Sequence, residues 1–229
     1  MVPLVVLAGC DPGGIIDVLK QVQSKAAPLR ALALFALAAG VVLAALPASA
    51  GTISGATGLI DVPSADVLGE GELELGVRYT GGELGLSAVY GIWDEVEVGV
   101  NNTRAGEHGV GFVFKGVLLR ETDSLPAVAI GLENGRSYAV ASKRVAPRVR
   151  LHAGYGAGQM QGLFAGISYA LTTVRAGGAG VPATTLFGEY TPKGLNAGAR
   201  LVFSPTVSAD IALLDLKEAA AGVNFRLSF

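Results

Sequence analysis

The feature that most constrains this chain is the alternation of apolar and polar residues within short segments that end at turns. The clearest examples are "ELELGVRYT" (72–80), "DEVEVGVN" (94–101), "RVRLHAGY" (148–155) and "GVNFRLSF" (222–229). Successive side chains of a β-strand point to opposite faces, so each segment predicts a strand with one apolar and one polar face.

Segments of this kind continue from residue 72 to residue 229, separated by Gly, Pro, Asn, Asp or charged residues. We predict strands at 72–80, 83–91, 94–101, 109–119, 126–133, 137–143, 147–155, 161–171, 183–191, 194–203, 207–214 and 222–229. That makes about twelve, within a range of roughly ten to fourteen. The links Gly81–Gly82, Trp93–Asp94, Asn134–Gly135 and Pro192–Lys193 are short, which indicates antiparallel neighbours in an up-and-down meander.

Two all-β architectures produce this pattern: a soluble barrel or sandwich with its apolar face inside, and a transmembrane barrel with its apolar face in lipid. Strands of this length can cross a bilayer at a tilt, and the apolar face carries mostly small and medium side chains. The six tyrosines lie at or near strand ends, as in an interfacial aromatic girdle: Tyr79, Tyr90, Tyr138, Tyr155, Tyr169 and Tyr190. We therefore predict a transmembrane antiparallel up-and-down β-barrel, and a secreted soluble β-barrel that binds an apolar ligand is the alternative.

The composition excludes several other classes of protein. After residue 51 the chain has no run of about 20 apolar residues, which a membrane-spanning helix needs. The net charge of −2 gives no excess of cations for binding nucleic acid. Cys10 is the only cysteine, so an internal disulfide framework and a cysteine-rich zinc site are excluded. No metal site and no cofactor is predicted.

The N-terminal residues have the pattern of a secretory signal peptide. Lys25 and Arg30 precede an uncharged run over 31–46, and "LPASAG" then offers a small-residue cleavage site after Ala50. We predict that residues 1–50 are this signal peptide and that the mature protein is located in the bacterial outer membrane. The first 24 residues add a second apolar patch, which we interpret as a mis-called start codon, although "LAGC" at 7–10 resembles a lipobox.

The sequence assigns no role to two segments of the chain. Residues 51–71, "GTISGATGLIDVPSADVLGEG", precede the barrel predicted for 72–229 and could cap its periplasmic mouth, form a plug or add a strand. With an even strand count both ends of the barrel lie in the periplasm, so the longest link, 172–182, falls on the periplasmic side. Turns there are usually short. Either the count is wrong by one strand at that point or this barrel departs from the rule.

The polar faces of the strands would line the lumen of a membrane barrel. The charged candidates, with one histidine, are Glu72, Glu74, Arg78, Glu95, Glu97, Lys115, Glu133, Arg148, Arg150, His152, Glu189, Arg200, Asp210 and Arg226. Their near balance of charge favours a network of ion pairs over a narrow selective pore, which stays the alternative. Closure of the barrel would place the last strand beside the first, so Arg226 is predicted to lie near Glu72 or Glu74.

The two histidines, His108 and His152, are the candidates for a catalytic base. His108 lies in a predicted external loop and His152 on a polar face, and neither has a serine elbow or an HExxH-type neighbourhood. We expect no enzymatic activity; a barrel that modifies lipids through His152 is the less favoured alternative.

The C-terminal segment resembles the assembly signal of bacterial outer-membrane barrels, with Val223, Phe225, Leu227 and Phe229 at the alternating apolar and terminal aromatic positions. The chain also resembles the YjbH family of outer-membrane proteins associated with exopolysaccharide production. The resemblance rests on "ATGLIDVPSADVLGEGELELGVRY", "YGIWDEVEVGVN", "KGVLLRETDSLPAVAIGLEN", "GLFAGISYAL" and "GEYTPKGLNAGARLVFSPTVSADIALLDLKEAAAGVNFRLSF". It implies a porin-like barrel of the cell envelope, with outer-membrane lipids, the barrel assembly machinery and polysaccharide as partners.

Overall fold

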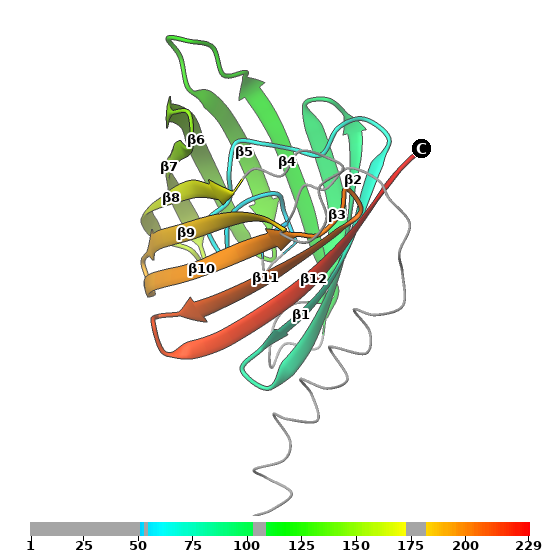
Figure 1. Cartoon of the computed structure of the whole chain (residues 1–229). Coiled ribbons are helices and arrows are strands. Elements are labelled where there is room, and N and C mark those ends of the chain that lie inside the picture. The colour runs from blue at the N-terminus through cyan, green and yellow to red at the C-terminus, as the bar shows by residue number, and fades with distance from the viewer. Residues whose placement is uncertain (1–50, 53–54, 103–108, 173–181) are drawn as a thin grey trace, which may run out of the picture. The chain divides into compact units, whose positions relative to one another are not determined.

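The computed structural model describes residues 51–52, 55–102, 109–172 and 182–229. They form twelve strands: β1 (Glu72–Thr80), β2 (Glu83–Trp93), β3 (Val96–Asn101), β4 (Gly111–Leu119), β5 (Ala127–Glu133), β6 (Arg136–Ala146), β7 (Val149–Gly158), β8 (Gly162–Thr172), β9 (Ala183–Thr191), β10 (Gly194–Val202), β11 (Val207–Leu214) and β12 (Glu218–Ser228). Each strand pairs with its sequence neighbours and β12 pairs with β1, so the sheet closes into an antiparallel barrel (Figure 1). No helix of the described residues is long and apolar enough to span a bilayer. The predicted fold and strand count are confirmed.

The strand boundaries agree with the predicted ones to within a few residues. The largest difference is at β12, which begins at Glu218 because residues 218–221 continue the ladder with β11. The link between β2 and β3 is Asp94–Glu95, since Trp93 still pairs with Val96. Asn134 and Gly135 both have positive φ, 48° and 73°, as a tight two-residue hairpin turn requires.

The long link between β8 and β9 lies at the end of the barrel where β12 finishes, because the meander has twelve strands. This barrel therefore departs from the rule that turns at that end are short. Residues 173–181 of the link lie outside the described part of the chain, as do His108 and the signal peptide predicted at 1–50.

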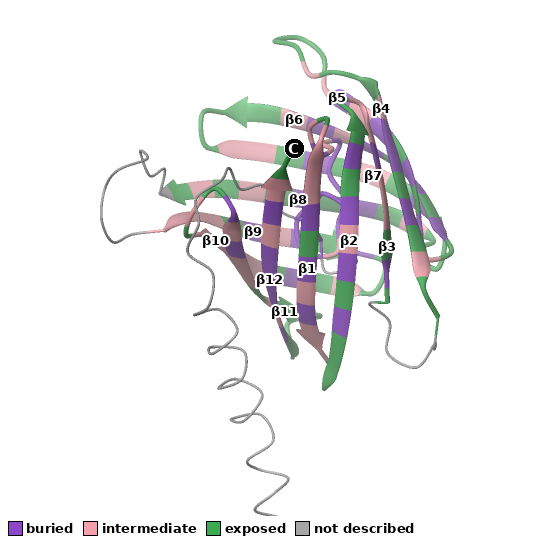
Figure 2. Cartoon of the chain, turned by 90° about the vertical axis from the view of Figure 1, so that its right-hand side faces the viewer, coloured by how far each residue is buried: buried purple, intermediate pink, exposed green. Residues whose placement is uncertain are grey.

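The two faces of the strands differ in the sense predicted for a membrane barrel. On β1, Glu74 and Arg78 are buried, whereas Leu75 between them is 40% exposed. Burial alternates in the same way along β2 and along most of β6 (Figure 2). The polar face of β1 therefore points into the barrel and its apolar face points outward, which contradicts a soluble barrel with an apolar ligand site inside.

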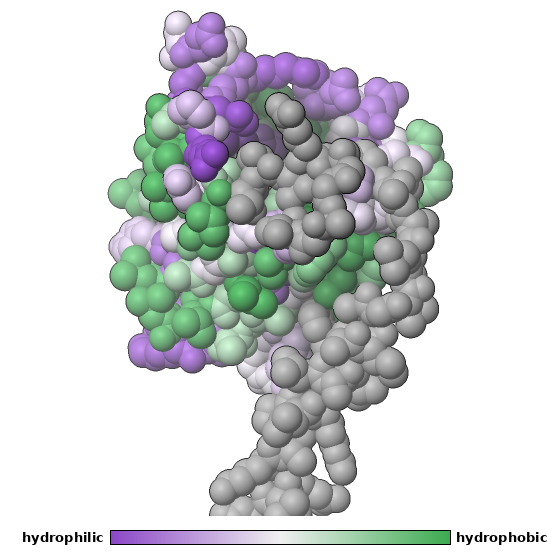
Figure 3. Space-filling view, viewed as in Figure 1, coloured by the Kyte–Doolittle hydropathy of each residue, from purple (hydrophilic) through white to green (hydrophobic). Residues whose placement is uncertain are grey.

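Large apolar side chains cover the outside of the wall. Leu86 of β2, Phe112 of β4, Leu163 of β8, Leu195 of β10 and Ile211 of β11 are all at least 49% exposed. Figure 3 shows hydrophobic residues along the wall and hydrophilic residues at the two rims. A continuous apolar belt of this kind would be unstable in water and matches the hydrocarbon layer of a bilayer. The structure is therefore that of a membrane barrel.

Three positional predictions are wrong. Tyr138 is 5% exposed and lies inside the barrel, because it shares the inward parity of Arg136 and Val140. Glu95 precedes β3 at the rim, where its half-exposed side chain pairs with Arg120. Arg148 is exposed in the turn between β6 and β7. Glu95 and Arg148 were assigned to the lumen from alternation, which loses its meaning beyond the end of a strand.

Candidate functional site: the plugged bore

The plug, defined here as residues 51–69, lies inside the barrel where the structure describes it, at 51–52 and 55–69. Of their apolar residues, Ala56, Leu59, Ile60, Val62, Ala65 and Leu68 are each at most 3% exposed. The plug does not extend the sheet: two isolated bridges, Gly51 with Thr57 and Gly58 with Pro63, fold it on itself. Figure 1 shows this segment in cyan within the ring of strands.

The plug crosses the full width of the bore. Thr57 donates from its backbone N–H and from its hydroxyl to Glu97 of β3, at 2.9 and 2.5 Å. A few residues later, Ile60 donates its backbone N–H to Glu189 of β9. Since β3 and β9 are six strands apart in a ring of twelve, these contacts join opposite walls.

Glu189 holds the plug through successive backbone N–H groups. Ile60 and Val62 donate to its Oε1 at 2.6 and 3.2 Å, and Asp61 donates to its Oε2 at 3.0 Å. Asn196 of β10 donates to the same Oε2 at 3.1 Å. Three consecutive N–H groups around one carboxylate form an anion-binding nest made by the plug.

Glu97 combines a wall ion pair with plug binding. Its Oε1 lies 3.1 Å from Nζ of Lys115, and both side chains are fully buried. Leu68 donates its backbone N–H to Glu97 Oε2 at 3.0 Å, while Lys115 donates to the carbonyls of Thr57 and Ser64 at 2.6 and 3.3 Å. A buried charge needs a partner and hydrogen bonds, and here the plug supplies most of the latter.

Two arginines bind plug carbonyl groups. Arg78 of β1 donates from Nε and Nη2 to the Thr52 carbonyl at 3.1 and 2.9 Å. Arg200 of β10 donates to the carbonyls of Gly51, Gly58 and Leu59 at 3.0, 3.0 and 3.1 Å. The fork of donors on each guanidinium suits this multiple contact. Charged wall groups thus recognise the backbone of the plug more than its side chains.

The two acidic side chains of the plug pair with arginines. Asp61 lies 2.8 Å from Arg136 and Asp66 lies 2.5 Å from Arg150, which also contacts Glu121 at 3.0 Å. Burial alone would raise the pKa of the Asp66 carboxyl, but the hydrogen bond and the charge of Arg150 outweigh it. The pKa of Asp66 therefore lies below its ordinary value.

Other charged residues pair within the wall. Arg226 of β12 lies 2.9 Å from Glu72 and 3.4 Å from Glu74 of β1, as closure of the barrel predicted. Arg200 contacts Asp210 at 2.7 Å, and Arg136 contacts Glu133 at 2.9 Å. The bore is a network of ion pairs into which the plug is bound.

His152 lies in this network beside a serine. Its Nδ1 is 2.8 Å from Oγ of Ser142, and both side chains are at most 3% exposed. The backbone N–H of Ala65 in the plug donates to the same Oγ at 2.8 Å. The pair is covered by the plug and faces the bore, whereas a lipid-modifying site would need to reach the lipid. The described residues contain no cluster of His, Cys, Asp and Glu suited to a metal ion.

One sector of the bore is apolar. Val62 and Ala65 of the plug pack against buried residues of β5, β6, β8 and the turn before β8: Ala127, Ala129, Tyr138, Val140, Met160 and Phe164. On the other side, Leu59 and Ile60 pack against Phe187 of β9. The plug therefore has its own hydrophobic core with the wall.

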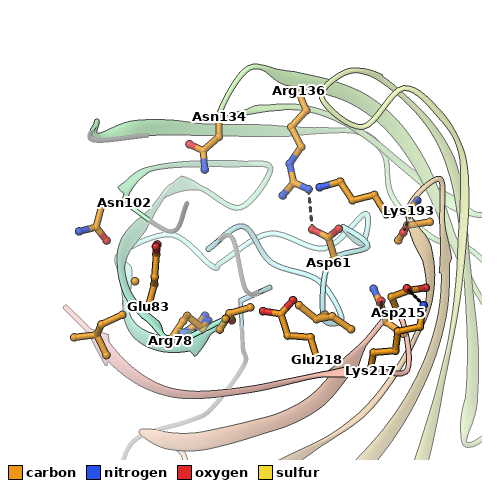
Figure 4. A pocket seen from close by; sticks show the side chains of 17 residues that line it. Asp61, Arg78, Glu83, Asn102, Asn134, Arg136, Lys193, Asp215, Lys217 and Glu218 are labelled. Carbon is orange, nitrogen blue, oxygen red and sulfur yellow. Dashed lines mark hydrogen bonds and ion pairs between the residues drawn. The ribbon is translucent and has the colours of Figure 1, made fainter. Parts of the chain in front are cut away.

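An open vestibule lies at the mouth away from the C-terminus. The cavity has a volume of about 580 Å³ and is bordered by Gly81, Asn134, Lys193 and Asp215 from four hairpin turns. Asp61 of the plug forms part of its floor and reaches Arg136 (Figure 4). The vestibule ends at the plug and is lined by amides, hydroxyl groups and charges of both signs.

The sequence identified most of the wall side of this site. Of the predicted lumen residues, Glu72, Glu74, Arg78, Glu97, Lys115, Glu133, Arg150, His152, Glu189, Arg200, Asp210 and Arg226 lie on the inner face. Arg136, Ser142 and Asn196 were missed. Their inward parity was available as a signal, and Arg136 follows the Asn134–Gly135 turn directly, where the hairpin sets it opposite Glu133.

The C-terminal residues were predicted as an assembly signal. Phe225 and Leu227 are half-buried on the outward side of β12, Val223 has the same parity but is buried, and Phe229 is 85% exposed. The backbone N–H of Phe229 donates to the Gly71 carbonyl at 3.0 Å, so the chain end is fixed beside the start of β1.

Several solved porin structures are similar to this chain. The KdgM porin in complex with disordered oligogalacturonate aligns with a TM-score of 0.47 and 11% identity, covering 69% of this chain and 99% of the porin. Omp33 of Acinetobacter baumannii aligns with a TM-score of 0.43 and 14% identity, covering 69% of this chain and 97% of Omp33. A triple mutant of the Rhodopseudomonas blastica porin aligns with a TM-score of 0.33 and 12% identity, covering 63% of this chain and 55% of the porin. A search of curated proteins gives no match.

The model of the YjbH family, described as "Exopolysaccharide biosynthesis protein YbjH", matches residues 52–184, more than half of the chain. The chain belongs to the YjbH family.

The YjbH match covers most of the plug and much of the barrel wall that binds it. It begins at Thr52, so it contains nearly all of the plug, and it continues through β1 to β8 and into the start of β9. Glu97 and Lys115 lie within it, whereas Glu189 and Arg200 lie beyond it. The C-terminal segment that resembles the family, residues 188–229, also lies outside the matched region. The plug is thus part of the segment that relates this chain to the family.

Proposed function

We propose that this protein is a non-enzymatic barrel of the bacterial outer membrane that serves exopolysaccharide production or export, with its bore closed by its own N-terminal segment. The observation that carries the proposal is the pair of anchors on opposite walls, Glu97 for Thr57 and Glu189 for residues 60–62. A segment tied at both ends of a diameter blocks passage through the bore.

The outer membrane is supported by three observations together. The barrel is closed and carries an apolar belt on its outside, as barrels of that membrane do. The chain ends on an aromatic residue after alternating apolar positions, and a signal peptide is predicted before Gly51. The family description supplies the link to exopolysaccharide.

The vestibule is the proposed contact for polysaccharide. Its lining combines Asn102, Asn134 and Asn196 with Thr80 and Thr191, which can donate to and accept from sugar hydroxyl groups. Its charges have both signs, so it has no strong preference for an anionic polymer. Both ends of a barrel with an even number of strands lie in the periplasm, so this opposite mouth faces the outside of the cell, where exported polymer is found.

Conductance across a planar lipid bilayer tests the closed bore. The mature protein should give no steady current, whereas a variant without residues 51–69 should give defined channels, because the bore then loses the segment that crosses it. A steady current through the intact protein, equal to that of the deletion variant, would contradict the proposal.

Accessibility of the plug gives a second test that needs no deletion. The mature region has no cysteine, so single cysteines can be labelled with a maleimide reagent without background. Ala65→Cys, at a plug residue 2% exposed, should react slowly, and Lys193→Cys at the exposed rim of the vestibule should react fast. Equal rates would show that the plug does not occupy the bore.

The role in exopolysaccharide is tested in cells. Deletion of the gene should reduce the polymer outside the cell, and the wild-type gene should restore it. A variant with Asn102→Ala and Lys193→Ala, at two exposed residues of the lining, tests the vestibule separately: it should reach the membrane at normal levels and restore less polymer. Normal polymer output from the deletion strain would reject this part of the proposal and leave the plugged barrel standing.

A further inference from the structure

The position of Gly51 connects the plug to processing of the chain. Gly51 is the first residue after the predicted cleavage site, and it is buried inside the barrel. Its backbone nitrogen donates to Oε1 of Glu74 at 2.5 Å. Its carbonyl oxygen accepts from Nη2 of Arg200 at 3.0 Å. Both polar groups of this one residue are thus held by the wall, from β1 and β10.

The site is shaped for a glycine. A side chain on Gly51 would place its Cβ 2.5 Å from the Gly55 carbonyl oxygen and 2.9 Å from Glu74 Oε1. Distances under about 3 Å to a backbone atom cannot be relieved by turning a flexible side chain. The fold of the plug at Gly55 therefore leaves no room for a side chain on residue 51.

Cleavage changes the chemistry of this nitrogen. A signal peptidase adds water across the Ala50–Gly51 peptide bond, which leaves a carboxylate on the leader and an amino group on Gly51. An α-amino group has an ordinary pKa of about 7.7, so it carries a positive charge in most molecules at neutral pH. The contact with Glu74 then changes from an amide hydrogen bond to an ion pair, which is the stronger of the two.

We propose that the α-amino group created by signal-peptide cleavage docks on Glu74 inside the barrel and locks the plug in the bore. The inference rests on the proposed plug and on cleavage after Ala50. Glu74 is well placed for the role: it is 3% exposed, its Oε2 faces Arg226, and its Oε1 faces Gly51. Removal of the leader thus creates the group that holds the plug.

The surrounding charges make Glu74 decisive. This sector of the wall holds Glu72, Glu74 and Asp210 against three guanidinium groups, those of Arg78, Arg200 and Arg226. With the ammonium group this sector has four cations and three carboxylates. Without Glu74 only two carboxylates would remain, and burial of the ammonium group would be unfavourable.

Reactivity of the α-amino group tests the lock. Mature protein purified from membranes is treated near neutral pH with an amine-reactive ester, in the folded state and in urea, and the N-terminal peptide is followed by mass spectrometry. We expect Gly51 to be the N-terminal residue and its amine to react at least about tenfold more slowly in the folded protein, because local opening is needed. A different N-terminus, or equal rates, would overturn the proposal.

Variants assign the protection to Glu74. Glu74→Gln should bring the folded-state rate close to the rate in urea, whereas Glu72→Gln should leave the amine protected. Glu72 also pairs with Arg226 but contacts the plug only at the Gly69 N–H. If Glu74→Gln does not fold, Gly51→Ala serves instead, since it keeps a small residue after the cleavage site and the added Cβ forces the nitrogen away. Full protection in whichever of these folds would overturn the lock.

The maleimide test of Ala65→Cys separates this inference from the proposed function. An unreactive cysteine together with a freely reactive amine means that the plug is in place but the lock is absent. A reactive cysteine means that the plug itself is wrong.

Discussion

Two sectors of the bore bind the same plug in different ways. Along β1, β3, β9 and β10 the wall presents buried charges, and carboxylates or cations hold plug backbone groups at defined distances. Along β5, β6 and β8 the wall presents Ala129, Val140 and Phe164, which pack against Val62 and Ala65. The charged sector can fix where each plug residue lies, because hydrogen bonds are directional, whereas the apolar sector excludes water without fixing register.

The same comparison explains why amphipathic alternation is strong in some strands and weak in others. On β1 the outer face is apolar and faces lipid, whereas the inner face carries the buried charges of Glu74 and Arg78. On β5 the outward Ile130 and the inward Ala129 are both apolar, because the inner face meets the apolar side of the plug. The inner face of β5 is therefore apolar beside Val62 and Ala65, and it is charged at Glu133, which pairs with Arg136 of β6.

The largest expected effect is the loss of Glu97. Glu97→Ala leaves Lys115 as a fully buried charge without its carboxylate and removes the acceptor for Thr57 and Leu68. Breaking a buried pair in this way costs about 3–5 kcal/mol of unfolding free energy. A urea titration in detergent micelles measures it.

Glu95→Ala is the matched control. It removes the same side chain two residues earlier, at the rim, where the partner Arg120 is exposed. The urea concentration at the midpoint of unfolding should stay near that of the wild type. A comparable loss in both variants would mean that the charged sector does not anchor the plug.

A charge on the outer face of β5 should have the next largest effect. Ile130 lies in the middle of the strand and is 42% exposed on the outside. Ile130→Arg should cost about 2–4 kcal/mol if this face meets the middle of the bilayer. The comparison is Val145→Arg near the end of β6, where the cost should fall to about 0–1 kcal/mol. Refolding into vesicles followed by urea unfolding measures both; equal costs would show that the belt does not follow membrane depth.

The strands were predictable from the sequence because alternation and turn residues are local signals. The pairs of Arg226 with Glu72 and Glu74 followed from closure alone. Tyr138 was misplaced because a tyrosine near a strand end suggested the membrane interface, whereas its parity with Val140 turns it inward, into the cluster that contains Val62 and Ala65. The strand pattern contains no information about a segment that lies outside the sheet.

The path of the plug was not predictable for the same reason. Residues 51–69 have no periodicity, and their contacts join residues up to 149 positions apart, as between Gly51 and Arg200. The charged inner face did indicate that buried partners were required. It could not indicate that a backbone rather than a solute supplies them.

A smaller effect is expected in the apolar sector. Val62→Ala removes two methyl groups at a fully buried plug position, worth about 0.8 kcal/mol for each methylene-sized group. The cost of roughly 1.5 kcal/mol should fall on plug docking, so cysteine labelling at position 65 should become faster while the barrel stays folded. Val128→Ala, on the outward face of β5, should leave the labelling rate unchanged. If both variants label alike, the apolar sector does not contribute to holding the plug.

The smallest effect is a dependence on acid pH through Asp66. Its pKa is lower in the folded protein than in the unfolded chain, so the charged Asp66 stabilises the fold above its unfolded pKa of about 4. That contribution is lost as the pH falls through the lower folded value. Asp66→Asn never has it, because the amide cannot form the ion pair with Arg150. The urea midpoint of the wild type should therefore exceed that of Asp66→Asn at pH 7, and the difference should shrink steadily on acidification. A difference that grows as the pH falls would mean that burial of Asp66 outweighs its pairing with Arg150.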